Sequence, residues 1–254
     1  MMRAASLLLF CTSLALAQPK PATTPYTPEV GQPGKDVVWV PTPQGVVDKM
    51  LDMARLTKSD YLIDLGSGDG RTVITAAKRG ARAMGIEYNA DMVELSKNNA
   101  RIAGVADRAT FMKADLFQTD LSRATVITMF LLPEINRKLR PRLLALKPGT
   151  RVVSNTFTMG DWKADEEHTV QGDACDGSWC TALLWIIPAK AAGTWQVPQG
   201  ELVLKQTYQQ LSGTLKTSER TVPVHGRVRG EDVMLSAGSA RYTGRVVDGK
   251  LVMQ

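Results

Sequence analysis

The chain has 254 residues, of which 44% are hydrophobic and 22% charged, and these proportions are typical of a folded globular protein. They exclude a disordered, collagen-like or coiled-coil chain. The formal charge of +6 comes from 31 basic and 25 acidic residues, an excess too small to indicate nucleic-acid binding. With only two histidines and three cysteines, the chain is not expected to hold a structural zinc ion or a histidine-rich catalytic metal.

Residues 1–17 have the three parts of a secretory signal, namely a basic start at Arg3, an apolar run from Leu7 to Leu16, and the small-x-small motif Ala15-Leu16-Ala17. The run is shorter than the roughly 20 residues that cross a bilayer. We therefore expect an exported protein, periplasmic or secreted. An uncleaved N-terminus that keeps the protein at a membrane is the alternative. Residues 18–35 contain five prolines and no apolar periodicity, which predicts a linker or an extended arm.

From residue 36 to residue 188, strand patterns alternate with helix patterns, which predicts a parallel sheet covered on both faces. The expected strands are residues 61–65, 81–87, 109–113, 126–130 and 151–157. The expected helices are residues 72–78, 91–103 and 134–146, preceded by a helix that begins near Pro43.

After residue 188 the pattern changes to short alternating runs separated by glycine-containing turns such as Asp248-Gly249. Residues 193–254 are therefore predicted to form a small antiparallel β module of consecutive hairpins. Residues 190–254 hold nine basic and five acidic side chains, and so carry most of the positive charge. We expect an anionic partner, such as an envelope or membrane surface, to contact this module.

Cys175 and Cys180 lie five positions apart in a loop rich in glycine, aspartate and serine. In an oxidising compartment such a pair forms a local disulfide. Redox-active pairs usually have C-x-x-C spacing at a helix start, which this pair lacks. A bridge that staples the loop is the prediction, and two free thiols are the alternative.

A glycine-rich turn, Asp64-Leu65-Gly66-Ser67-Gly68-Asp69-Gly70-Arg71, joins the first expected strand to the helix after it. Glycines at such a turn let the backbone approach a ligand closely, and the amides that open the helix favour negative charge. In the dinucleotide-binding pattern G-x-G-x-x-G the third glycine would stand at Arg71. The spacing therefore argues against a nicotinamide dinucleotide.

Three acids end or follow successive expected strands, namely Asp64, Glu87 and Asp115. Because the carboxyl ends of parallel strands meet at one edge of a sheet, these acids are expected to converge on a single crevice. Glu87 is placed to accept hydrogen bonds from both ribose hydroxyls of a nucleoside. Asp115 is placed to accept from an adenine amino group while Leu116 covers the ring.

With these motifs, the stretch from Trp39 to Ile187 resembles a class I S-adenosylmethionine-dependent methyltransferase. Four motifs resemble, more narrowly, the small protein-lysine methyltransferases of mitochondrial type and their bacterial relatives: Val40-Pro41-Thr42-Pro43, Gly68-Asp69-Gly70-Arg71, Phe130-Leu131-Leu132-Pro133 and Met159-Gly160-Asp161-Trp162. The resemblance implies an α/β fold, a doubly wound, mostly parallel seven-stranded sheet of Rossmann-like type. The last hairpin would be residues 168–171 and 180–187, joined by the cysteine loop. Nothing is implied for residues 193–254.

The resemblance also implies S-adenosyl-L-methionine as the cofactor. The cofactor-binding residues expected on this basis are Asp64, Gly66, Ser67, Gly68, Gly70, Glu87, Tyr88, Asn89, Asp115, Leu116 and Phe130.

Many amino-methylating relatives carry Asn/Asp-Pro-Pro-aromatic after the fourth strand, where this chain has Phe130-Leu131-Leu132-Pro133. No side-chain carboxylate or amide stands at the first position of that motif, so no catalytic residue is assigned. The acceptor-side candidates are Leu131, Leu132, Asn136 and Trp39, with Trp162 as a second aromatic residue for the acceptor channel. The alternatives are that Glu134 and Asn136 only begin a helix, and that both tryptophans belong to the core.

The function expected from the sequence is N-methylation of a protein, at lysine, by in-line methyl transfer. The methyl acceptor is a protein or a small molecule, and no nucleic-acid partner is expected. Export is difficult to reconcile with this cofactor, because the cofactor is made in the compartment that contains ATP. The alternative is therefore a catalytically weak, exported nucleoside-binding or scaffold protein whose basic β module binds an anionic envelope partner.

Overall fold

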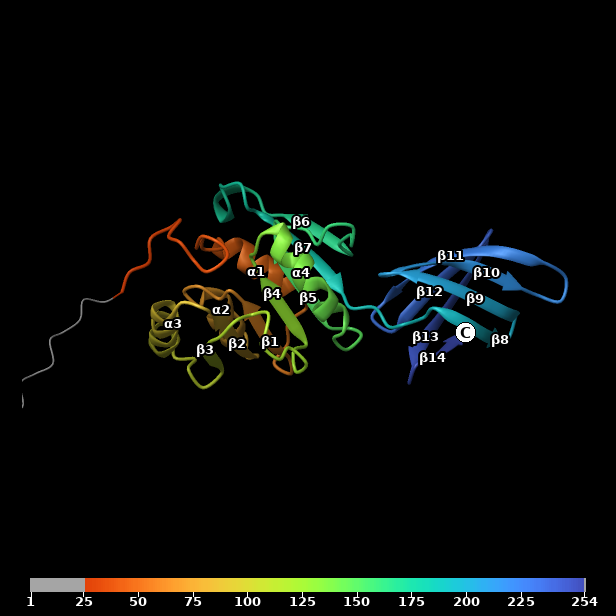
Figure 1. Cartoon of the computed structure of the whole chain (residues 1–254), viewed down its shortest axis with the longest axis horizontal. Coiled ribbons are helices and arrows are strands. Elements are labelled where there is room, and N and C mark those ends of the chain that lie inside the picture. Colours follow the sequence, from red (N-terminus) through yellow and green to blue (C-terminus); the bar gives the residue numbers. More distant parts are fainter. Residues whose placement is uncertain (1–25, 254) are drawn as a thin grey trace, which may run out of the picture.

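The structure is a computed structural model that describes residues 26–253, so the predicted signal at residues 1–17 and the first part of the predicted linker lie outside the described residues. It consists of two seven-stranded sheets that lie side by side, joined by residues 187–192 (Figure 1). No helix within residues 26–253 has both the length and the apolar character needed to cross a membrane.

The first sheet has the strand order β3-β2-β1-β4-β5-β7-β6. Strands β1 to β5 are parallel, and β7 runs antiparallel to both β5 and β6. The bounds are β1 (Tyr61–Leu65), β2 (Arg82–Glu87), β3 (Ala109–Lys113), β4 (Val126–Met129), β5 (Arg151–Asn155), β6 (Glu166–Thr169) and β7 (Thr181–Ile186). The predicted fold class is confirmed, including the final hairpin.

Helices cover both faces of this sheet, because successive side chains of a buried strand point to opposite faces. Leu62 of β1 packs among side chains of α1 (Gln44–Met53), α2 (Arg71–Lys78) and α3 (Ala90–Ile102). The next residue, Ile63, lies in the other core layer, with α4 (Pro133–Leu144). A single turn of 3-10 helix, Gly172–Ala174, lies in the loop between β6 and β7.

The second sheet is an antiparallel meander in which each strand pairs with the next. Its strands are β8 (Gly193–Val197), β9 (Gly200–Thr207), β10 (Gln210–Lys216), β11 (Thr221–Arg229), β12 (Asp232–Ala237), β13 (Ala240–Val247) and β14 (Lys250–Met253). Alternate residues such as Leu202 and Leu204 are buried in a core of its own, and β14 approaches β8, so the sheet curls around that core. The predicted meander of hairpins is confirmed.

The turn between β9 and β10 packs against the first unit. The Tyr208 ring stacks on Trp162 with centroids 5.7 Å apart. Gln209 is only 2% exposed; its Oε1 accepts from Trp162 Nε1 at 2.9 Å and its Nε2 donates to the Lys163 carbonyl at 2.8 Å. Trp162 is therefore part of the contact between the two units. The suggestion that it lines an acceptor channel is wrong, since its side chain is fully buried in that contact.

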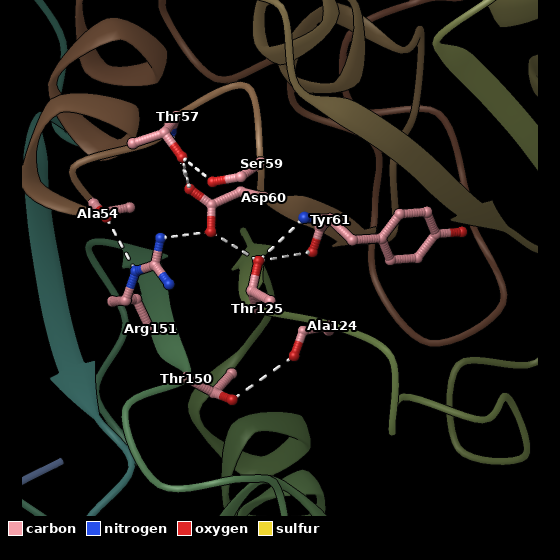
Figure 2. Close-up of polar contacts among 9 residues, drawn as sticks. All are labelled: Ala54, Thr57, Ser59, Asp60, Tyr61, Ala124, Thr125, Thr150 and Arg151. Carbon is pink, nitrogen blue, oxygen red and sulfur yellow. Dashed lines mark hydrogen bonds and ion pairs between the residues drawn. The ribbon is translucent and has the colours of Figure 1, made fainter. Parts of the chain in front are cut away.

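A polar network ties three strands together at the edge of the first sheet where they begin (Figure 2). Asp60 precedes β1, Thr125 precedes β4, and Arg151 opens β5. Asp60 Oδ1 accepts from Thr125 Oγ1 and from Arg151 Nη2, each at 2.7 Å, and Asp60 Oδ2 accepts from the Thr57 amide at 2.8 Å. Burial alone would raise the pKa of Asp60, but these hydrogen bonds and the Arg151 charge hold it below its usual value. The network stabilises the strand ends opposite the glycine-rich turn.

Candidate cofactor site

A pocket lies where β1, β2, β3 and β4 end. Ten of the predicted cofactor-binding residues line it: Asp64, Gly66, Ser67, Gly68, Glu87, Tyr88, Asn89, Asp115, Leu116 and Phe130. The strand ends bring these residues together because the sheet is parallel and each strand is followed by a turn at the same edge.

The glycine-rich turn follows β1 and leads into α2. Gly66 and Gly68 have φ angles of 76° and 53°, in the left-handed region that favours glycine. A Cβ on Gly68 would lie 2.5 Å from the Trp39 indole nitrogen, so the turn has no room for a side chain. Gly70 does not line the pocket. It is the N-cap residue before α2, and a Cβ there would lie 2.8 Å from the Phe111 ring, so its contribution is to helix packing.

Glu87 stands at the end of β2, and its carboxylate is oriented by backbone amides. Oε2 accepts from the Gly68 amide at 3.0 Å, and Oε1 accepts from the amides of Tyr88 and Asn89 at 2.8 and 2.9 Å. The bond to Gly68 joins the β2 end to the glycine-rich turn. An ionised carboxylate has about four acceptor positions, and the three amides fill three of them, which leaves Glu87 Oε2 able to accept one further bond from a ligand hydroxyl.

Asp115 follows β3 and faces the N-terminal part of the described chain. Lys35 Nζ lies 2.7 Å from Asp115 Oδ2 and 4.9 Å from the centre of the Tyr88 ring. The hydrogen bond and charge of Lys35 hold the pKa of Asp115 below its usual value. Asp115 is thus already paired, and it would have to share its oxygens with any ligand amino group.

Asp64 lines the pocket and is 6% exposed. Its Oδ1 accepts from Thr128 Oγ1 of β4 at 2.7 Å. Burial raises the pKa of Asp64 to about 7; the Thr128 bond opposes the shift, and the charges of Glu87 and Asp69 add to it. A cationic group bound beside Asp64 would pair with the carboxylate, favour its ionised form and so lower its pKa again.

Residues before α1 form a flap over the pocket that the sequence did not predict. The Gly31 amide donates to the Trp39 carbonyl at 2.8 Å, and the Trp39 amide donates to the Gln32 carbonyl at 2.9 Å. Residues 32–42 all line the pocket. The end of the predicted linker, residues 32–35, is therefore folded onto the site. The five prolines suggested an extended arm, and the local sequence has no periodicity that would reveal contacts so distant along the chain.

The acceptor-side candidates separate into two pairs. Trp39 and Leu131 line the pocket. Leu132 is the residue before α4 and is 45% exposed, outside the lining residues. Asn136 is fully buried in α4, where its Nδ2 donates to the carbonyl of Phe157 at 3.0 Å, so it braces the segment after β5 and does not reach the pocket.

The donors and charges of the pocket suit an adenosine ligand with a cationic centre. Ser67 lines the pocket, and its Oγ is buried and has no hydrogen-bond partner among the described residues. The charged lining residues are the acids Asp36, Asp64, Asp69, Glu87 and Asp115 and the bases Lys35 and Arg71. Both bases are ion-paired with lining acids, which leaves the pocket with an acidic excess.

Comparisons with known proteins agree with this chemistry. Residues 64–166 match the ANTKMT methyltransferase domain family. A protein-lysine N-methyltransferase of Saccharolobus islandicus (strain REY15A) is 45% identical over 138 residues, which cover 53% of this chain and 86% of that protein. The adenine nucleotide translocase lysine N-methyltransferase of Mus musculus is 34% identical over 135 residues, which cover 52% of this chain and 57% of that protein.

A solved structure supports the cofactor. It is described as an RNA methyltransferase from Salinibacter ruber in complex with S-adenosyl-L-homocysteine, and it is 49% identical to this chain. The match covers 59% of this chain and 95% of that one, with a TM-score of 0.55. The cofactor of this chain is S-adenosyl-L-methionine.

Proposed function

This chain belongs to the family of S-adenosylmethionine-dependent protein-lysine methyltransferases, and we propose that it methylates the ε-amino group of a lysine in an envelope or exported protein. One observation carries the proposal: the pocket is acidic, and both of its bases are already paired. Such a site attracts both a cationic cofactor and a cationic lysine.

The order of the strands supports one orientation of the cofactor. Asp115 follows β3 and Glu87 ends β2, so the adenine and ribose ends belong over these two strands. Asp64 lies in β1, next to β4, and its carboxylate is placed for the cationic amino-acid end. The methyl group is then presented toward the end of β4, where Phe130 and Leu131 line the pocket.

Methyl transfer requires little acid or base assistance from the chain. The lysine enters as an ammonium and would lose one proton to water, which exposes the ε-nitrogen lone pair. The lone pair would then form a bond to the methyl carbon while the carbon–sulfur bond electrons go to sulfur, which leaves a methylated ammonium. Leu131 is 4% exposed and Phe130 is half-buried, so this part of the pocket is apolar. Burial of a lysine against such residues lowers its pKa and favours the neutral nucleophile. Positioning and exclusion of water are therefore what the chain contributes.

RNA is the second candidate acceptor, because the 49% identical structure from Salinibacter ruber is described as an RNA methyltransferase. A polyanion needs unpaired lysine and arginine residues to neutralise its phosphates. The acidic excess of the pocket opposes such binding, and we therefore prefer the protein acceptor.

The compartment is a further part of the proposal. The signal-like pattern of residues 1–17 supports export. The Cys175–Cys180 disulfide supports an oxidising compartment, where such bridges persist. The basic excess of residues 190–254 supports contact of the β module with an anionic envelope surface. Fractionation of cells that express the chain with a C-terminal tag tests this part: shortened protein in the exported fraction is expected, and full-length protein in the cytoplasm would contradict it.

A labelling experiment tests the acceptor. Purified protein is incubated with methyl-labelled cofactor and an envelope extract, in samples pretreated with either protease or ribonuclease. We expect acid-stable label in ε-methyllysine that survives ribonuclease and disappears after protease. Label that only ribonuclease removes would establish RNA as the acceptor instead. The Glu87→Ala variant, with its weakened cofactor binding, is the control for enzyme-dependent label.

A further inference from the structure

The loop between β6 and β7 presents a large aromatic side chain to solvent. Trp179 is 42% exposed, although tryptophan is usually buried. It contacts Phe130, with ring centroids 6.0 Å apart and an angle of 60° between the planes. Phe130 in turn stacks on Phe157, with centroids 5.8 Å apart. The three rings form a continuous group, which we call the aromatic wall.

The aromatic wall lies at the acceptor side of the pocket. Phe130 follows β4 and lines the pocket, and Phe157 follows β5. Trp179 precedes β7, which runs antiparallel to β5, so the start of β7 meets the end of β5 at the same edge of the sheet. The wall therefore extends from the methyl-transfer end of the cofactor site out to solvent.

Two contacts fix the loop that carries Trp179. The disulfide joins Cys175 to Cys180, the residue directly after Trp179, and both cysteines are buried. On the other side, Ala174 packs against Gly45 in the first turn of α1, where an added Cβ would lie 2.7 Å from Ala174 Cβ. Trp179 thus sits in a short, doubly anchored segment.

The loop also has the charge that a lysine would require. Asp173 and Asp176 are both exposed and flank Cys175 in the same loop. Carboxylates at an entrance raise the local concentration of a cationic side chain. Aromatic faces then attract the ammonium group and pack on the methylene stem.

We infer that the aromatic wall of Phe130, Phe157 and Trp179 receives the side chain of the methyl-accepting lysine, and that the Cys175–Cys180 bridge positions Trp179 for this purpose. The inference rests on the proposed lysine acceptor. Trp179 is a specificity determinant that touches the substrate, and the two cysteines are positioning residues.

A binding experiment tests the wall without turnover. The five tryptophans are replaced by 5-fluorotryptophan, and the Trp179 signal is assigned by loss in Trp179→Phe. The protein is saturated with S-adenosylhomocysteine and titrated with Nα-acetyl-trimethyllysine methylamide, and then with its uncharged tert-butyl isostere. We expect the Trp179 fluorine signal to shift with the cation and to shift much less with the isostere. Trp195, in β8 of the other sheet, is the internal control. An unmoved Trp179 signal would overturn the inference.

A kinetic experiment separates this inference from the proposed function. With labelled cofactor and envelope extract, Trp179→Ala should raise the half-saturating acceptor concentration about tenfold, with Trp179→Phe intermediate and Trp195→Phe unchanged. The Kd for S-adenosylhomocysteine should stay as in the wild type. If Trp179→Ala labels the acceptor as the wild type does, the inference about the aromatic wall is refuted while the proposed function stands. Intact cofactor binding with no label in protein refutes the lysine acceptor.

The cysteines are tested by the same assay. The double variant Cys175→Ala/Cys180→Ala should raise the half-saturating acceptor concentration in the same direction as Trp179→Ala, with cofactor binding intact. Adding reductant to the wild type should reproduce the effect and should not change the double variant. A double variant with wild-type acceptor saturation would show that the bridge does not position Trp179.

Discussion

We expect the buried carboxyl group of Asp64 to make cofactor binding dependent on pH. In the free protein its pKa is raised to about 7 by burial, against the hydrogen bond from Thr128. In the proposed orientation of the cofactor, its cationic amino group pairs with the ionised carboxylate, so protonation of Asp64 would compete with binding. The ionised fraction is about nine tenths at pH 8 and about one tenth at pH 6, which predicts an affinity about tenfold weaker at pH 6.

Calorimetry with S-adenosylhomocysteine at pH 6, 7 and 8 measures this effect. Asp64→Asn is the matched variant, because the amide keeps the side-chain size and an oxygen that accepts from Thr128. Its Kd should be weaker than that of the wild type at pH 8 and nearly constant across the range. The histidines, His168 and His225, lie on β6 and β11 outside the pocket lining.

Asp64 should also affect the stability of the cofactor-free protein, but with the opposite pH dependence: lower pH should weaken cofactor binding and increase stability. Because the folded-state pKa of Asp64 is raised, the folded chain binds more protons than the unfolded chain between about pH 4 and 7. The contribution of Asp64 to the free energy of unfolding is therefore present at low pH and is lost as pH rises through 7. A wild-type Kd that does not change from pH 6 to 8, or an equal slope in Asp64→Asn, would refute the reasoning.

Three further predictions follow from single contacts. Glu87→Ala removes the carboxylate that the Gly68 amide orients, and should weaken S-adenosylhomocysteine binding by about 1–3 kcal/mol in calorimetry, whereas unchanged affinity would remove Glu87 from the site. Asp60→Asn leaves Arg151 without its ionised partner and should lower the free energy of unfolding in urea by about 3 kcal/mol at pH 7. The difference between variant and wild type should shrink as pH falls through the lowered pKa of Asp60, because the wild-type carboxylate then loses its charge. Gln209→Leu leaves the buried Trp162 indole N–H and the Lys163 carbonyl unpaired, and should cost about 2 kcal/mol of stability in the same assay while the Kd for the cofactor stays constant.

The cofactor half of the site could be predicted because its signals are local. Gly66 and Gly68 mark a turn that requires positive φ angles, and the acids Asp64, Glu87 and Asp115 each stand at a strand end. A parallel sheet brings all its carboxyl ends to one edge, so the strand pattern alone places these residues together. Gly70 has the same local signal as Gly68 but faces Phe111 and Ser96 instead of the pocket, because it packs against the helix side of the turn.

The acceptor half could not be predicted because it is assembled from segments far apart in the chain. Trp162 and Asn136 were candidates by position, yet Trp162 is buried against Gln209 of the β module and Asn136 braces the backbone after β5. Conversely, nothing in the local pattern around Trp179 indicates that it contacts Phe130, which lies 49 positions earlier in the sequence.

The sequence by itself determined the order of strands and helices, the glycine-rich turn and the acids at the strand ends, because hydrophobic periodicity and backbone conformation are properties of neighbouring residues. Only the tertiary structure decided that residues 32–42 close over the pocket, that Tyr208 and Gln209 join the β module to the first unit, and that Trp179 lies beside Phe130. Each of these contacts depends on how distant elements pack, and side-chain packing between distant elements leaves no periodic signal in the chain.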